Sequence, residues 1–235
     1  ANVAVNDINL ESFKEFDEAI EANSIVELIE GHGVKAMGIE ANVCNEKDAK
    51  GVVEQVVSEF GRIDILINNA GGIAGLPKDS FASTVSFEDI KATMDRNLMG
   101  TIYCSQAAAL HMKSQEFGRI VNTSSQAGLR SQGAGVYASY GVAKAGVIAY
   151  TKYLAQELGR YNITVNCLAP AYVATERLMR QSFRQVKDIR KELGVPLGRL
   201  AEPEDIANVM EFFVTDLGSY ITGQTISVCG GAINF

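Results

Sequence analysis

The sequence has few of the residues that build metal centres or histidine-dependent active sites. Only two histidines occur, His32 and His111, and neither lies in a cluster of possible ligands. This scarcity argues against a histidine-based metal site and against a Ser-His-Asp triad, so we expect no metal. Tryptophan is absent altogether.

Cysteine is also scarce and widely spaced. The four cysteines form no Cys-x-x-Cys pair, which argues against a thiol redox motif. The spacing favours reduced thiols that pack as small hydrophobic side chains, as in cytosolic proteins. We therefore expect a cytoplasmic protein with free thiols at Cys44, Cys104, Cys167 and Cys229.

Positive charge and long apolar runs are missing as well. The formal net charge is −7 and the pI is near 5.0, whereas nucleic-acid-binding proteins usually carry a basic stripe. No apolar run is long enough to span a bilayer, and no signal peptide is visible. We expect neither a nucleic-acid nor a membrane partner.

What the sequence does contain is an alternation of short apolar runs and amphipathic stretches. Its 235 residues suffice for one sizeable α/β domain with a single core. Helical periodicity is predicted over 10–31 as two short helices, then over 46–60, 86–115 and 137–160, and from Pro203 onward. Strands are predicted at 3–5, 34–43, 63–67, 119–123, 163–168 and 225–228.

Tyr140 and Lys144 form the pair that points most directly to chemistry. Residues four apart on a helix share one face, so a lysine ammonium would lie beside a phenol. The positive charge favours the phenolate and should lower the tyrosine pKa toward the range of a general acid or base. The alternative is a tyrosine ring that packs on a lysine stem.

Further motifs accompany this pair in a fixed order. They are Asn68-Asn-Ala-Gly71, Asn97, Gly118-Arg-Ile-Val-Asn-Thr-Ser-Ser125-Gln-Ala-Gly128, Val165-Asn-Cys-Leu-Ala-Pro170 and Tyr220-Ile-Thr-Gly223. Together with Tyr140-Gly-Val-Ala-Lys144, they resemble the short-chain dehydrogenase/reductase family. The resemblance runs from about Val3 to Phe235, and the joint match is far more specific than any single motif.

The resemblance implies a fold and an assembly. The expected fold is a three-layer, doubly wound parallel sheet of Rossmann type, with residues 1–235 in a single domain. A substrate lid is expected at about 176–200. The helix at 137–160 and the helix before it form the subunit interface in the family, which implies a homotetramer or homodimer.

The resemblance also implies a reaction: reversible hydride transfer between a nicotinamide cofactor and a secondary alcohol or ketone. Tyr140 would exchange the proton, Lys144 would lower the tyrosine pKa and bind the nicotinamide ribose, and Ser125 would position the substrate oxygen. Asn97 would hold a water in a proton relay through its side chain and a local helix distortion. Ser124 is a weaker candidate than Ser125, and Tyr137 lacks a lysine four residues on.

The cofactor expected is NAD rather than NADP. An acid at the end of the second strand of a dinucleotide fold accepts hydrogen bonds from the ribose hydroxyls, and Asp7 occupies that position. Its carboxylate would also repel a 2′-phosphate, although a helix N-cap or turn is the ordinary use of such an aspartate. The other residues implied to bind the cofactor are Asn42, Val43, Asn69, Ala70, Gly71, Tyr140, Lys144, Pro170, Val173 and Thr175.

The sequence departs from the family pattern in one major respect. No glycine-rich turn precedes Asp7, although the family places a strand, such a turn and a helix there to hold the pyrophosphate. That strand would be central in the sheet, so we expect the gene product to be longer than these 235 residues; a naturally shorter chain is the alternative. A non-catalytic partner subunit without cofactor binding is the rival function.

The substrate class stays open at this level. The lid and the loop at 131–135 would define it, and their side chains carry no readable chemistry. Secondary alcohols, polyols, steroids and 3-oxoacyl thioesters are all compatible with the motifs.

Overall fold

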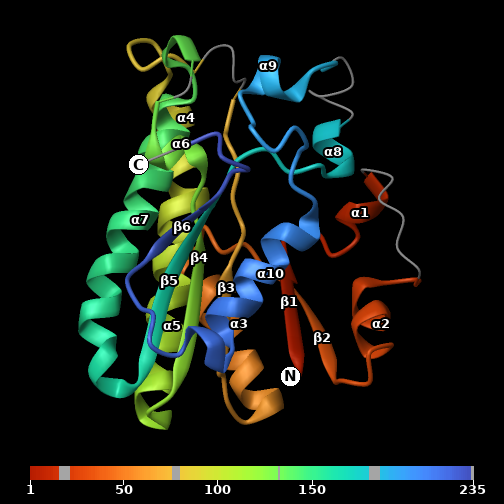
Figure 1. The fold of residues 1–235 in the computed structure, drawn as a ribbon. Helices are drawn as coiled ribbons and strands as arrows, with labels where there is room; N and C mark the ends of the chain where they lie inside the picture. The colour runs from red at the N-terminus through yellow and green to blue at the C-terminus, as the bar shows by residue number, and fades with distance from the viewer. Residues whose placement is uncertain (16–21, 76–79, 132, 180–185, 234–235) are drawn as a thin grey trace.

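The computed structural model describes residues 1–15, 22–75, 80–131, 133–179 and 186–233. Every strand pairing in this part of the chain is parallel. One sheet joins β1 (Val3–Asp7) to β2 (Ala36–Glu40), and a second has the order β3 (Ile65–Asn68), β4 (Gly118–Thr123), β5 (Ile163–Pro170) and β6 (Thr225–Val228). Helices flank the sheets on both sides, which makes a Rossmann-like α/β fold (Figure 1).

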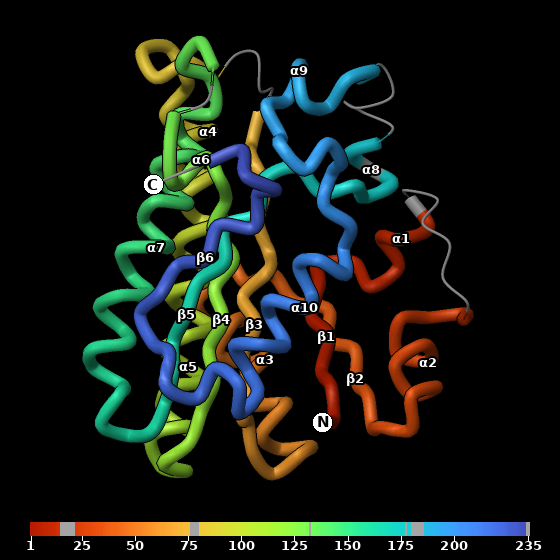
Figure 2. The backbone as a smooth tube through the Cα atoms, viewed as in Figure 1, coloured from red at the N-terminus to blue at the C-terminus, as the bar shows by residue number. Residues whose placement is uncertain are grey.

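Helices follow the strands along the chain. The short α1 (Ser12–Glu15) and α2 (Ile25–Glu30) lie between β1 and β2, as the sequence predicts. The longer helices are α3 (Glu46–Phe60), α4 (Phe87–Met94), α5 (Gly100–Gln115), α7 (Ala138–Leu158) and α10 (Pro203–Val214). Short helices α6 (Gln126–Leu129), α8 (Glu176–Leu178) and α9 (Ile189–Leu193) lie near the carboxyl ends of the strands (Figure 2).

Local sequence signals set several helix ends. Asn45 caps α3 by accepting hydrogen bonds from the backbone N–H groups of Lys47 and Asp48, at 2.9 and 3.2 Å. Ser86 caps α4 in the same way, and α10 begins with Pro203 behind a capping box formed by Glu202 and Asp205. These side chains satisfy N–H groups that a helix cannot satisfy internally.

The core has two parts, one on each face of the four-stranded sheet. The larger part lies between the sheet and α3, α5 and α7, and it includes the fully buried Met112 and Leu158. The smaller part lies under α10, where Phe213 packs against Val121 and Leu168. The two faces are therefore closed by different helices.

The strand predictions need one correction at β3. Its apolar run predicted burial on both faces, but the Ile67 side chain is 42% exposed. Ile67 pairs with Val121 of β4, so both point to the face that α10 covers over β4 and β5. Leu66 points the other way and packs on the larger core. The strands β1 and β3 are not paired with one another, and the expected unit ahead of Ala1 stays a prediction.

A buried polar network ties the sheet to its helices. The Asn68 side-chain amide donates to Ser105 Oγ at 2.9 Å and to Asn122 Oδ1 at 2.8 Å. Asn122 in turn donates to Thr151 Oγ1 of α7 at 2.9 Å. Because unsatisfied buried amides are costly, this series of hydrogen bonds fixes the spacing of β3, β4, α5 and α7. The end of β3 is held in place just before the Asn69–Gly71 loop.

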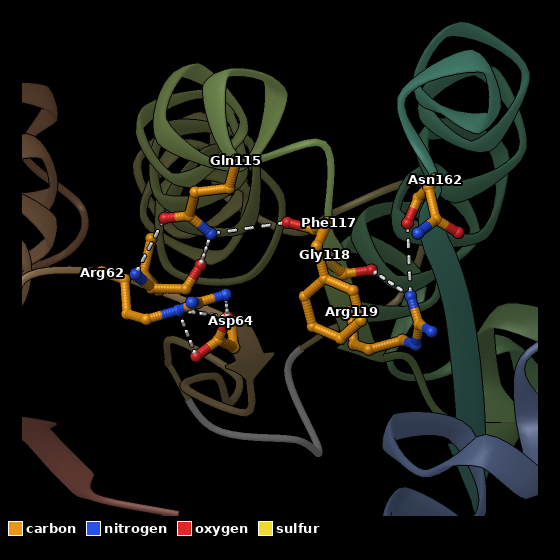
Figure 3. Close-up of polar contacts among 8 residues, drawn as sticks. Arg62, Asp64, Gln115, Phe117, Gly118, Arg119 and Asn162 are labelled. Carbon is orange, nitrogen blue, oxygen red and sulfur yellow. Dashed lines mark hydrogen bonds and ion pairs between the residues drawn. The ribbon is translucent and has the colours of Figure 1, made fainter.

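The amino ends of β3 and β4 form a separate structural cluster (Figure 3). The Gln115 amide donates to the Ile63 carbonyl at 2.8 Å, and Arg62 pairs with Asp64. Arg119 is 5% exposed, yet its guanidinium donates to the carbonyls of Gly118 and Asn162 and lies 4.5 Å from the Phe117 ring centroid. These contacts satisfy part of the buried guanidinium, whose Nε has no hydrogen-bond partner among the described residues.

The remaining boundaries differ from the predictions by a few residues. The strand expected at 34–43 is limited to Ala36–Glu40, whereas the strand expected at 163–168 continues to Pro170. The expected lid includes α8 and α9, and its residues 180–185 lie outside the described chain. Among the described residues, no helix combines the length and the apolar character that a membrane crossing requires.

Candidate active site

Tyr140 and Lys144 lie one turn apart near the start of α7, as their spacing predicts. The Lys144 side chain is almost wholly buried at 3% exposure, and its Nζ lies 5.7 Å from the centroid of the Tyr140 ring. Lys144 Nζ donates a 2.7 Å hydrogen bond to the Thr123 carbonyl at the end of β4. Two further N–H donors of this ammonium have no partner among the described residues.

The expected effect of Lys144 on the Tyr140 pKa is wrong for the chain without a cofactor. Burial raises the pKa of Tyr140 above its ordinary value, a hydrogen bond with Ser125 opposes that rise, and Tyr137 adds to it. Burial also lowers the pKa of Lys144 to about 8. The ammonium points at a carbonyl rather than at the phenol oxygen, so desolvation exceeds charge stabilisation at both groups.

The structure separates the two candidate serines. Ser124 is buried and donates to the Lys144 carbonyl at 2.8 Å, so its hydroxyl supports the backbone of α7. Ser125 is the N-cap of α6 and accepts from the Ala127 N–H at 3.2 Å, while its side chain also bonds with Tyr140. Ser125 is therefore the serine that lies at the phenol.

Asn97 lies in the helix distortion that the family resemblance implies. Residues Asp95–Met99 form a π-helix between α4 and α5, and Asn97 is fully buried within it. Single π-turns of this kind occur frequently at functional sites. The wider turn directs the Asn97 amide toward the loop that follows β3.

Gly71 joins Asn97 to Lys144. A Cβ atom at position 71 would lie 2.6 Å from Asn97 Oδ1 and 3.0 Å from Lys144 Nζ. Only a glycine lets the backbone approach both groups this closely. Asn97, Lys144 and the Asn69–Gly71 loop therefore meet at one point, at the carboxyl ends of β3 and β4.

The side chain of Asn97 makes more hydrogen bonds to the protein backbone than the expected role in holding a water implies. Its N–H groups donate to the carbonyls of Gly72 and Thr93 at 2.7 and 2.8 Å, and its oxygen accepts from the Gly72 N–H at 3.0 Å. Its backbone carbonyl accepts from Thr101 Oγ1. The bound water stays a prediction, and the observed task of Asn97 is to fix the loop backbone.

The residues expected at the adenosine end lie on the other sheet. Asp7 ends β1, is exposed, and accepts from the Asn9 N–H at 3.0 Å. Glu40 is the register partner of Asp7, so two carboxylates stand side by side at the strand ends. Asn42 is exposed and accepts from the Cys44 N–H, whereas Val43 packs on Gly100 of α5.

The residues expected near the nicotinamide follow β5. Pro170 is its last residue, Val173 forms a bridge with Ala201, and Thr175 caps α8 by accepting from the Leu178 N–H at 3.3 Å. The bridge joins the two segments that flank the expected lid. The φ of Ala171 is not positive, as an alanine at this position predicts.

Sequence reasoning set Tyr137 aside and missed Ser80. Tyr137 precedes α7 with a left-handed backbone at φ 62° and ψ 24°, and its side chain acts electrostatically on Tyr140. The buried Ser80 accepts from the Tyr137 N–H at 2.8 Å. A tyrosine at positive φ has no sequence signature, and Ser80 belongs to a loop 57 residues away in the chain.

Comparison with known proteins places this geometry in context. A family model described as Enoyl-(Acyl carrier protein) reductase matches residues 1–232. A cyclohexanol dehydrogenase of Rhodococcus sp. (strain TK6) is 43% identical over 98% of this chain and 86% of its own length. A 3-oxoacyl-[acyl-carrier-protein] reductase of Synechocystis sp. is 36% identical over 91% of this chain and 83% of its own.

A solved structure agrees with these relatives. An NAD⁺-bound xylitol dehydrogenase superimposes with a TM-score of 0.80 at 29% identity, over 98% of this chain and 88% of its own. The match extends over both sheets and the helices that flank them. The parallel α/β fold, the family model and the relatives together show that this chain belongs to the short-chain dehydrogenase/reductase family.

Proposed function

We propose that this protein is an NAD-dependent oxidoreductase that interconverts a secondary alcohol and a ketone through Asn97, Ser125, Tyr140 and Lys144. The observation that carries the proposal is the meeting of Ser125, Tyr140 and Lys144 at the carboxyl ends of β3 and β4. Ligands of open α/β sheets bind at these strand ends. The family membership supports nicotinamide chemistry on a CH–OH group.

The residues fit one end of a nicotinamide cofactor. The buried Lys144 ammonium has donors to spare beyond the Thr123 carbonyl, and a ribose supplies the hydroxyl oxygens that would accept them. Gly71 lets the loop backbone approach Lys144 and Asn97 more closely than any residue with a side chain would allow. When bound, the nicotinamide supplies the hydride acceptor or donor, and the protein supplies orientation and the proton.

The proton resides on Tyr140 Oη. Because burial raises its pKa, Tyr140 is a neutral phenol at pH 7 and can donate a proton to a ketone oxygen. In the reverse direction its phenolate accepts the alcohol proton, and rising pH increases the phenolate fraction. Ser125 would orient the substrate oxygen toward the phenol and Lys144 would bind the cofactor ribose, while Asn97 holds the loop.

Replacing Tyr140 by Phe tests this assignment. The ring and its packing are kept while the exchangeable proton is lost, so kcat should fall about 10²- to 10⁴-fold. Binding of NADH should change little, and the protein has no tryptophan to obscure the cofactor fluorescence. The measurements are steady-state alcohol oxidation and NADH titration of both proteins. Near-normal turnover in Tyr140→Phe would refute the role of Tyr140, and absence of NADH binding to the wild type would favour a non-catalytic partner subunit.

Asp7 should set the preference for NAD. Two adjacent carboxylates, Asp7 and Glu40, stand at the strand ends where the adenosine ribose is expected, and both would repel a 2′-phosphate. In Asp7→Ala, the ratio of kcat/KM for NAD to that for NADP should fall about tenfold, equivalent to about 1.4 kcal/mol. Glu11→Ala, an exposed acid on the neighbouring segment, is the control. An unchanged ratio in Asp7→Ala would contradict the assignment.

Burial of Lys144 should leave a signature in the pH dependence of stability. In the unfolded chain the lysine holds its proton up to about pH 10.5, whereas in the folded chain it loses the proton near pH 8. Raising the pH from 8 to 10.5 therefore favours the folded state, and the burial penalty is fully present below pH 8. Relative to Lys144→Met, the wild type should gain on the order of 3 kcal/mol of unfolding free energy over that range.

Urea unfolding of the cofactor-free proteins at several pH values measures this difference. Other groups titrate in both proteins and cancel in the comparison. Parallel pH profiles of the wild type and Lys144→Met would show that the Lys144 pKa is not lowered.

We further infer a homotetramer or homodimer that uses the outer face of α7. Val142 and Tyr153 on α7 are 63% and 80% exposed, and Leu110 on α5 is 61% exposed. Ala145, Ile148 and Ala149 line a shallow groove beside Tyr153 that a second helix could enter. The variant Tyr153→Glu places a charge on this face, so it should shift the mass measured by light scattering toward that of the monomer. The variant Phe87→Glu, at an exposed residue of α4, is the control and should leave the mass unchanged. A monomeric wild type would contradict the inference.

The four thiols support a location in the cytoplasm. Cys44, Cys104, Cys167 and Cys229 are free, and three of them are buried. Reduced, packed cysteines are typical of proteins in a reducing compartment. Cell fractionation tests this location, and recovery outside the cytoplasm would contradict it.

A further inference from the structure

We propose that Tyr137 is a specificity-determining residue whose ring forms one wall of the substrate site beside Tyr140 and selects alcohols that carry an apolar ring. The proposal rests on the proposed function, because it assumes that Tyr140 meets the substrate oxygen. It adds the chemical class of the substrate and a residue that no sequence motif identifies.

The backbone of Tyr137 is held in an unfavourable conformation. Its φ of 62° lies in the left-handed region, which aromatic residues rarely adopt because the Cβ crowds the following carbonyl. A glycine or asparagine would meet this backbone at lower cost. Strained residues persist only where their surroundings fix them, and they cluster at functional sites.

Ser80 is the residue that fixes this conformation. Its Oγ accepts from the Tyr137 N–H at 2.8 Å, and its carbonyl accepts from the Ala138 N–H at 3.2 Å. Ser80 is 2% exposed, so these bonds are shielded from water. Two N–H groups at the start of α7 are thereby satisfied by a distant loop, since the Tyr137 side chain makes no cap. The side chain of Tyr137 is left available for another purpose.

Tyr137 lies three positions before Tyr140 at the start of α7. It is near enough to act on Tyr140 electrostatically, and this interaction helps to raise the Tyr140 pKa. Tyr137 is half-buried rather than part of either core cluster. We therefore assign this half-buried ring to the border of the site beside the Tyr140 hydroxyl.

A second aromatic side chain lies where the Ser80 loop meets the start of α7. Phe81 follows Ser80 directly and is 40% exposed, so a second aromatic ring belongs to the same junction of loop and helix. Aromatic walls favour apolar rings by area burial and by ring stacking. A polyol would lose water from hydroxyl groups that such a wall cannot satisfy. The geometry points to cyclic or ring-bearing secondary alcohols rather than open-chain polyols.

Two substitutions at position 137 distinguish the effect of the aromatic ring from the effect of the strained backbone. Tyr137→Phe keeps the aromatic wall and removes the hydroxyl, whereas Tyr137→Asn removes the wall and tolerates the left-handed backbone. Tyr220→Asn, a fully exposed tyrosine, is the matched control. The assay measures kcat/KM with NAD⁺ for cyclohexanol, 2-butanol and xylitol as ring, open-chain and polyol probes.

We expect Tyr137→Asn to lower kcat/KM for cyclohexanol at least tenfold, chiefly through KM, with less than a threefold change for 2-butanol. Tyr137→Phe and Tyr220→Asn should keep the wild-type preference for cyclohexanol over xylitol. If Tyr137→Asn does not fold by circular dichroism, Tyr137→Gly replaces it, because glycine adopts this φ without strain.

The possible failures are distinguishable. A wild type that oxidises no alcohol would refute the proposed function itself. An active wild type whose ratio of cyclohexanol to 2-butanol is unchanged in Tyr137→Asn would overturn only the role of Tyr137. An equal loss on all three alcohols would show that Tyr137 merely supports the start of α7.

Discussion

The candidate site depends on one interaction: the hydrogen bond from the Lys144 ammonium to the Thr123 carbonyl. It joins the first turns of α7 to the end of β4. The ammonium belongs to a residue that is only 3% exposed to solvent. Burying that charge is unfavourable, as the lowered pKa of Lys144 shows. The neighbouring residues are arranged around this cation. The backbone of the loop after β3 approaches it closely, which leaves no space for a side chain at Gly71.

Two of these neighbours are constrained by close contacts. Gly71 cannot carry a side chain because Asn97 and Lys144 occupy that space. Asn97 in turn binds both backbone groups of Gly72, which the π-turn in its helix makes possible. The loop after β3 is thus fixed by side chains from two helices rather than by a sheet ladder. Rigid positioning of this kind is what a site for orienting a cofactor requires.

The sequence was sufficient where a feature depends on residues close together in the chain. The helix over Glu46–Phe60 and the strand over Thr225–Val228 have the predicted bounds, because a cap or an apolar run defines each locally. The π-turn at Asn97 and the position of Tyr140 beside Lys144 also agree with expectation. The motifs that encode these features are short.

Features that depend on distant contacts could not be predicted. The Tyr140 pKa was expected to fall, but burial has the larger effect because Lys144 is directed at a carbonyl that no motif reveals. Ile67 was expected inside, and its exposure depends on which helix covers each strand. Ser124 and Ser125 are adjacent in sequence, and only their hydrogen bonds to different parts of α7 tell them apart.

The same reasoning separates the two sides of the site. The side proposed for proton transfer is built from strand ends and helix turns whose geometry is fixed by regular hydrogen bonding. The side bordered by Tyr137 is built from a strained backbone and a serine 57 residues away, so it depends on a loop rather than on the sheet. A loop can change its side chains without disturbing Lys144, Asn97 or Gly71. Under the proposed function, substrate choice can therefore vary while the geometry at Lys144, Asn97 and Gly71 is retained, because the two sides are held by different contacts.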